Sequence, residues 1–123
     1  YSRYTNLSLL DPIYDQRALD ELRSNCKIYI HGHSVGGTNP SLVEAMHLGL
    51  PCLVYDVNYN RETTEDCAEY FSSQSELSEA LPRLWESKEH LDSIREGLLA
   101  VAKRRYLWSD IITKYRCVIE NSV

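Results

Sequence analysis

Two periodicities of apolar residues divide this chain into short and long segments. Short apolar runs at residues 7–10, 28–30, 52–55 and 68–71 are typical of β-strands, and the run at 52–55 reads as a fully buried one. Elsewhere apolar residues recur every three or four positions, which predicts helices at about 15–25, 39–48 and 60–65, from 75 onward, and at 88–105 and 109–121. This alternation predicts an α/β domain, namely a Rossmann-like parallel sheet with flanking helices and a helical C-terminal end.

Residues with special backbone preferences mark the ends of several predicted helices. Asp15, Asn39 and Asn60 are good N-caps, and Pro40 fits the first helical position, where no N–H is needed. Gly49 is expected to end the central helix. The helix after Asp15 is expected to bury Ala18, Leu19 and Leu22. The last two helices carry apolar faces made of Leu91, Ile94, Leu98, Val101 and Ala102, and of Ile111, Ile112, Tyr115, Val118 and Ile119.

The composition narrows the class of protein. With 123 residues, 43% hydrophobic and 25% charged, the chain has the length and composition of one soluble domain, covering residues 1–123. A net charge of −5 argues against a nucleic-acid partner. No apolar run approaches the roughly 20 residues that span a bilayer. Because the chain begins with Tyr1 and shows no secretory signal, we expect a piece of a longer, cytoplasmic protein.

The four cysteines are far apart and form no C-x-x-C pair, so we expect reduced thiols rather than a zinc site. His31 and His33 lie two residues apart at a strand end and resemble a ligand pair. No third ligand is near them in the sequence, and no D-x-D pattern occurs, so we predict no metal.

The stretch 27–49 carries the clearest candidate chemistry. A strand leads into a loop with three glycines, Gly32, Gly36 and Gly37, and then into the helix that begins at Asn39 and Pro40. Unpaired N–H groups in a first helical turn, together with the helix dipole, favour an anion. Glu44, one turn into the helix, can accept hydrogen bonds from two neighbouring hydroxyls. An ordinary strand-to-helix turn would show much of the same pattern.

A hydrolase is a rival interpretation of the same loop. Residues 32–36, GHSVG, match the G-x-S-x-G nucleophile elbow with Ser34 as nucleophile, Asp56 as a possible acid and His90 as the one histidine well downstream. In such an elbow the helix starts directly after the serine, whereas here Asn39 and Pro40 place it about five residues later. A third possibility is an interaction module without chemistry. The aromatic side chains of Trp85, Trp108 and Tyr115 are expected to be packing residues.

Residues 37–51, GTNPSLVEAMHLGLP, resemble the donor-binding segment of retaining glycosyltransferases of the GT-B fold, family 4. The preceding HGHSVG makes the likeness strongest to bacterial members of O-antigen or capsule assembly, often labelled rhamnosyltransferases. Asn60-Arg61-Glu62, Tyr70-Phe71 and the final RYLW at 105–108 extend the resemblance over most of the chain. Two features depart from the family: Gly36 stands where a glutamate is usual, and we expect these 123 residues to lack the N-terminal acceptor domain.

The resemblance implies a partial C-terminal domain of a GT-B fold and a role for each matching residue. It assigns the donor sugar and diphosphate to His33, Gly36, Gly37, Thr38, Asn39 and Pro40. It assigns the ribose to Glu44, and the base or cleft to Pro12, Ile13, Tyr14, Asn60, Arg61 and Glu62. The co-substrate would be a nucleotide-sugar, used without a metal, and the acceptor a glycan or a lipid-linked glycan. Such enzymes work in the cytoplasm, some attached peripherally to the membrane.

Overall fold

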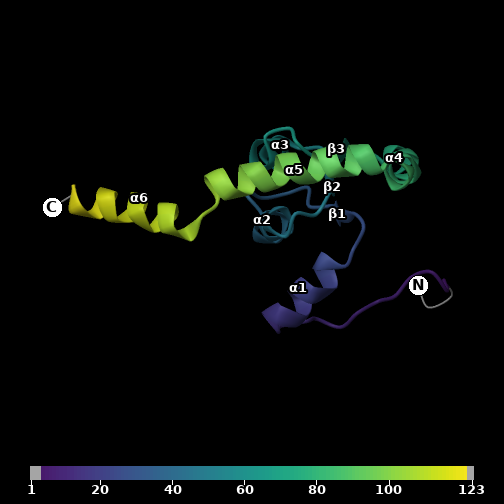
Figure 1. The fold of residues 1–123 in the computed structure, drawn as a ribbon, viewed down its shortest axis with the longest axis horizontal. Coiled ribbons are helices and arrows are strands. Elements are labelled where there is room, and N and C mark those ends of the chain that lie inside the picture. The colour runs from purple at the N-terminus through teal and green to yellow at the C-terminus, as the bar shows by residue number, and fades with distance from the viewer. Residues whose placement is uncertain (1–3, 122–123) are drawn as a thin grey trace.

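A computed structural model describes residues 4–121 of the chain (Figure 1). Its centre is a parallel sheet of three strands, β1 (Tyr29–His31), β2 (Cys52–Tyr55) and β3 (Glu69–Phe71), in the order β1-β2-β3. Tyr29 is opposite Cys52, and Leu53 is opposite Glu69. The predicted α/β class and parallel pairing are therefore confirmed, and the strand predicted at 68–71 lies at a sheet edge.

Six helices connect and flank these strands. They are α1 (Gln16–Ser24), α2 (Pro40–His47), α3 (Asn58–Thr64), α4 (Gln74–Glu86), α5 (Lys88–Arg105) and α6 (Trp108–Glu120). Asp15 caps α1 through a 2.7 Å hydrogen bond from the Ala18 N–H, as its sequence position predicts. Within the described residues, none of these helices is long and apolar enough to cross a membrane.

The C-terminal end of α2 is a Schellman motif. Gly49 has φ +67, donates to the Met46 carbonyl at 3.1 Å, and is followed by Leu50, which donates to the Ala45 carbonyl at 3.1 Å. Leu48 is the C-cap, so Gly49 occupies the position just after it rather than the cap itself. The turn directs the chain into β2, which begins five positions after the end of α2.

Helix α5 is the main packing element of the core. Figure 1 shows it running across the domain with α2 on one side and α3 on the other. It contacts α2 and α4, and Arg104 and Arg105 in its last turn both bond Glu65, the C-cap residue of α3. The buried face predicted for α5 is confirmed, since Leu91, Ile94, Leu98, Val101 and Ala102 are all buried.

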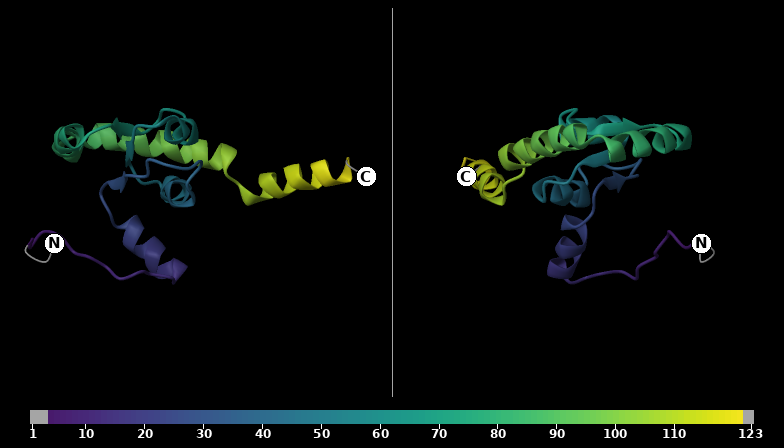
Figure 2. Two further views of the ribbon diagram at one scale, coloured as in Figure 1. Left: turned by 180° about the vertical axis from the view of Figure 1, so that it is seen from behind. Right: turned by 45° about the vertical axis from the view of Figure 1, so that its right-hand side comes forward.

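Three predictions about the N-terminal and middle segments are wrong. Residues 7–10 form no strand and are exposed, because no neighbouring strand in the described chain pairs with them. Helix α1 buries none of Ala18, Leu19 or Leu22, since it stands apart from the sheet (Figure 2). Asn60 does not cap α3: the helix starts at Asn58, and Asn60 is turned into the interior.

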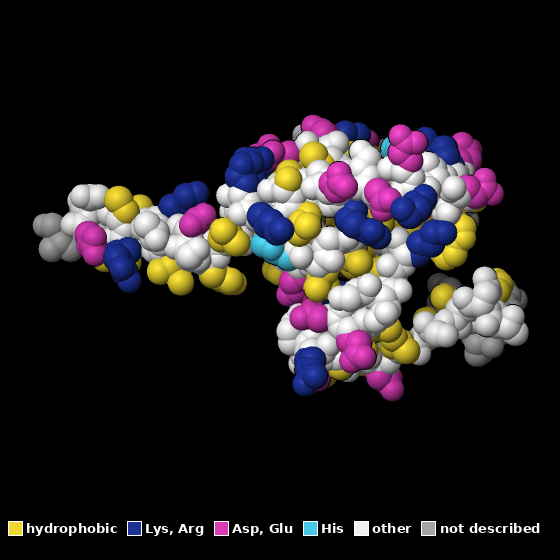
Figure 3. All heavy atoms as spheres, viewed as in Figure 1, with side chains coloured by type: hydrophobic (Ala, Val, Ile, Leu, Met, Phe, Trp, Pro, Cys, Tyr) yellow, Lys and Arg dark blue, Asp and Glu magenta, His cyan; other side chains and the backbone are white. Residues whose placement is uncertain are grey.

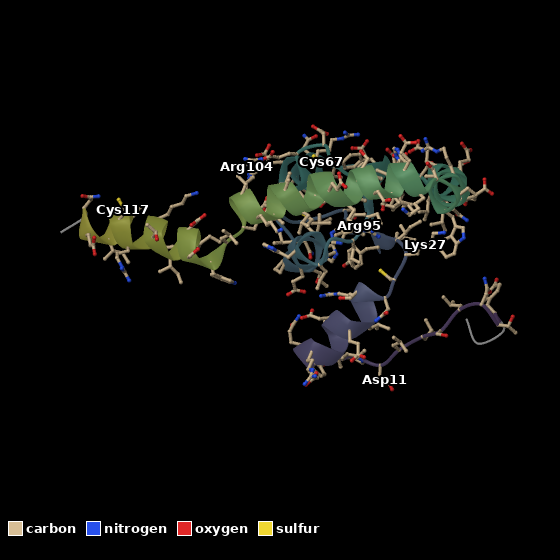
Figure 4. The ribbon with its side chains drawn as sticks, in the orientation of Figure 1. Asp11, Lys27, Cys67, Arg95, Arg104 and Cys117 are labelled. Atoms are coloured by element: carbon tan, nitrogen blue, oxygen red, sulfur yellow. The ribbon has the colours of Figure 1, made fainter. Side chains whose placement is uncertain are left out.

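Helix α6 extends away from the rest of the chain, as Figure 1 and the left view of Figure 2 show. None of its residues is buried, so the apolar face predicted at 111–119 has no cover. Trp108 and Tyr115, expected to be packing residues, are exposed instead. Figure 3 shows hydrophobic side chains gathered on one side of this helix. All four cysteines are free thiols; Cys117 on α6 and Cys67 near α5 are labelled in Figure 4.

Candidate functional site

The carboxyl ends of β1 and β2 are joined by the side chain of Asn60. Its Nδ2 donates to the Tyr55 carbonyl at 2.9 Å and to the His33 carbonyl at 3.0 Å, and the residue has no exposed surface. Tyr55 ends β2, and His33 stands two residues beyond β1. The amide therefore ties the loop after β1 to the end of the neighbouring strand, at the sheet edge where parallel α/β folds bind ligands.

Two buried polar atoms at this edge have no partner within the described residues. They are Nε2 of His31, in a side chain only 4% exposed, and Oδ1 of Asn60. The rings of His31 and His33 stack with centroids 5.5 Å apart. Burial, and secondarily the charge of His33, lowers the pKa of His31, so its imidazole is neutral at pH 7. Among residues 4–121, no three side chains of the metal-binding types gather into one group.

The loop between β1 and α2 presents its backbone to solvent. Its residues from Gly32 to Thr38 are exposed, and Gly36 has φ +119, a conformation that L side chains rarely adopt. In the described chain, the backbone amides of Gly36, Gly37 and Thr38 donate to no protein acceptor. These three N–H groups, like those of Ser34 and Val35 in the same exposed loop, are open to an anion.

The first turn of α2 does not supply the unpaired amides that the sequence predicts. Pro40 has no N–H, and the Ser41 N–H donates to Oδ1 of Asn39 at 2.9 Å. The Leu42 and Val43 N–H groups both donate to the Asn39 carbonyl. Asn39 thus accepts the hydrogen bonds of the N–H groups in the first turn of α2. The unpaired N–H donors lie in the loop before the helix instead.

The same geometry bears on the hydrolase interpretation. Asn39 is the N-cap of α2, and the helix begins at Pro40, six positions after Ser34. Ser34 lies within the exposed loop rather than on a sharp strand-to-helix turn. This placement lacks the elbow that would hold a serine nucleophile above the sheet.

A groove of about 290 Å³ runs along α2 and continues onto the start of α6. One wall contains Thr38, Pro40 and Glu44, three of the residues assigned to the donor by resemblance. His47 closes this wall, with its Nε2 3.0 Å from the Tyr106 carbonyl. The full lining is Thr38, Pro40, Val43, Glu44, His47, Tyr106, Trp108 and Ile111.

Glu44 is paired as well as accessible. Its Oε2 accepts from Arg23 at 2.5 Å, and its side chain keeps 41% of its surface exposed while that of Arg23 keeps 13%. Arg23 belongs to the last turn of α1, so this ion pair connects α1 to the groove. Sequence reasoning missed Arg23, because an arginine 21 positions earlier gives no local signal of the contact.

Two of the remaining residues assigned by resemblance, Arg61 and Glu62, lie on α3. Arg61 makes two hydrogen bonds to Asp56, at 2.5 and 2.8 Å, and one to Asp66, and its guanidinium lies 4.1 Å from the Tyr70 ring centroid. Those bonds lower the pKa of Asp56. Glu62 pairs with Arg105 at 3.3 Å. Both residues of α3 are therefore committed to partners within the protein, unlike Asn60.

The segment with Pro12, Ile13 and Tyr14 lies apart from this groove. It is extended and largely exposed, with Tyr14 at 92%, and none of the three lines the groove. Figure 4 shows the neighbouring Asp11 on the same segment beneath α1. The structure thus brings together the loop, Glu44 and Asn60, but not residues 12–14.

Comparisons with protein-family models, curated proteins and solved structures found no match. Exposed loop amides suit a phosphate group, a half-exposed carboxylate suits vicinal hydroxyls, and the two meet at Thr38, which belongs to both the loop and the groove.

Proposed function

We propose that this chain is the donor-binding part of a glycosyltransferase, which holds a nucleotide-sugar while its sugar is moved to a glycan or lipid-linked acceptor. The observation that carries the proposal is the groove in which Thr38, Pro40 and Glu44 lie together, directly after an exposed glycine loop. The motif GTNPSLVEAM supports it, because the same residues match the donor segment of family-4 enzymes of the GT-B fold.

The proposed binding mode places each part of the donor against a matching chemistry. The diphosphate accepts hydrogen bonds from the open amides of Gly36, Gly37 and Thr38, and the Asn60 tether holds the loop in position for them. Glu44 accepts from the two ribose hydroxyls after its carboxylate is shared with, or released by, Arg23. Fixed dipoles of the loop, rather than a bound metal, would offset the charge of the leaving diphosphate.

The proposal extends to the cellular location of the enzyme, and several donor sugars are compatible with it. The enzyme would act in the cytoplasm in bacterial surface-polysaccharide synthesis, with peripheral contact to the membrane that carries its acceptor. Gly36 in place of a carboxylate suits a deoxyhexose donor such as dTDP-rhamnose, and UDP-hexoses and GDP-mannose are the competing choices.

The test is a titration of the 123-residue chain with a panel of nucleotide-sugars, in which binding is measured by NMR chemical-shift changes. Glu44→Gln should weaken binding by about tenfold, because loss of a charged acceptor costs on the order of 1.5 kcal/mol. Glu96→Gln, an exposed glutamate on α5, is the matched control and should bind like the parent. Equal affinities of parent, Glu44→Gln and Glu96→Gln would refute the assignment of Glu44.

A hydrolase makes the opposite predictions in the same preparation. It would cleave a p-nitrophenyl ester, lose this activity on Ser34→Ala, and keep it on Glu44→Gln. We expect no ester cleavage above that of buffer, and no effect of Ser34→Ala on nucleotide-sugar binding.

A further inference from the structure

The groove has a second wall that sequence reasoning did not assign to any ligand. It is built by Tyr106, Trp108 and Ile111, at the junction of α5 and α6, more than 60 positions from Glu44. Tyr106 is held in place, because its hydroxyl donates to the Thr63 carbonyl at 3.1 Å and its own carbonyl meets His47. The wall therefore stands at a defined position across from α2.

Trp108 is the unusual member of this wall. Its side chain is 76% exposed although it lines the groove, and no cation or aromatic ring of the described chain lies on its indole. The other tryptophan, Trp85, shows the alternative: Lys27 Nζ lies 4.0 Å from its ring centroid and donates to its carbonyl at 2.7 Å. A large aromatic face in a groove, left open in this way, offers stacking to a flat ring.

The two walls differ in chemistry. The α2 wall offers a carboxylate in Glu44, a hydroxyl in Thr38 and an imidazole in His47, whereas the opposite wall is aromatic and aliphatic. A ligand that matches both has a planar ring joined to a hydroxyl-bearing ring, which describes a nucleoside. The volume of about 290 Å³ is at the small end of the range for ligand pockets, which suits a nucleoside and not a whole nucleotide-sugar.

We propose that Trp108 stacks on the base of the nucleotide while Glu44 holds the ribose of the same nucleoside. This inference rests on the proposed function and deepens it by placing the base. The base then lies against the start of α6, rather than beside Pro12, Ile13 and Tyr14, which are not in the groove. Thr38 belongs to both the groove and the open loop. A diphosphate joined to the ribose in the groove therefore lies next to the loop N–H groups that bind it.

The chain provides its own fluorescence test, because it contains only two tryptophans. Trp85→Phe leaves Trp108 as the single reporter, and Trp108→Phe leaves Trp85. Each protein is titrated with UDP, dTDP and GDP, and with inorganic pyrophosphate as the ligand that lacks a base. We expect the nucleotides to quench the emission of Trp108 and leave that of Trp85 unchanged, and pyrophosphate to quench neither.

Affinity provides the second readout. Trp108→Leu should weaken nucleotide binding by about 5- to 150-fold, the range measured when a base-stacking aromatic is removed, and Trp108→Phe should recover part of the loss. Pyrophosphate affinity should be the same in all three proteins. Far-UV circular dichroism of each variant confirms that α6 has kept its helix.

The outcomes separate this inference from the proposed function. If Glu44→Gln weakens nucleotide binding but Trp108→Leu does not, the stacking role is overturned and the donor-binding function stands. If Trp108→Leu weakens pyrophosphate and nucleotides equally, the residue acts on the fold and the stacking role is again overturned. If no nucleotide binds at millimolar concentration, both proposals fall.

Discussion

Replacing Asn60 with alanine tests whether one buried amide holds the ligand-binding edge of the sheet together. The change leaves the carbonyls of Tyr55 and His33 without the donor that they share, at a cost of about 2 kcal/mol each. Two gains oppose this loss. Alanine is the better helix former by roughly 0.6 kcal/mol, and the unpartnered Oδ1 no longer has to be buried. We therefore expect a net loss of about 1–2 kcal/mol.

Urea denaturation followed by circular dichroism measures this loss directly. With a slope of about 1.5 kcal/mol per molar urea, the midpoint should fall by roughly 1 M. Asn58→Ala is the matched control, since it makes the same substitution at an exposed position of the same helix and should shift the midpoint little. Equal midpoints for the two variants would refute the tether. Asn60→Ala should also weaken nucleotide-sugar binding, because the loop at His33 loses its anchor.

Two further predictions concern the loop and the buried histidine. An added Cβ meets nothing within 4 Å at either Gly36 or Gly37, but of the two only Gly36 has a positive φ, +119. Gly36→Ala should therefore lower stability by about 1 kcal/mol, whereas Gly37→Ala should change it by less than about 0.5 kcal/mol; equal urea midpoints would contradict this. The pKa of His31 is lower in the folded than in the unfolded protein, so the unfolded chain takes up the proton first. Stability should therefore fall as pH drops below about 6.5, and His31→Leu should remove much of that slope between pH 7.5 and 5.5 in urea titrations.

The parts of the fold that local patterns predicted are those stabilised by local interactions. The helix limits of α5 and the N-cap Asn39 with Pro40 follow from spacing and backbone preference. The strand predicted at residues 7–10 failed for the opposite reason. A strand exists only when another strand pairs with it, and the described chain offers none to that segment.

The candidate site shows the same division. Glu44, Thr38 and Pro40 were identified from the motif, and they do lie in one groove. The Arg23 partner and the Trp108 wall were missed, because both contacts join residues 21 to 64 positions apart and depend on how whole helices pack. Asn60 was misassigned as a cap, since asparagine is equally suited to a helix end and to bridging two buried carbonyls.

The long helix α5 has a consequence for how this protein is made. It provides five of the fifteen buried hydrophobic residues found in the described chain, yet it begins only at Lys88. Until this helix has been synthesised, the rest of the core lacks the apolar face that α5 packs against it. The nascent chain then exposes apolar surface until α5 has been synthesised. Chaperone binding during synthesis should therefore end once α5 has left the ribosome.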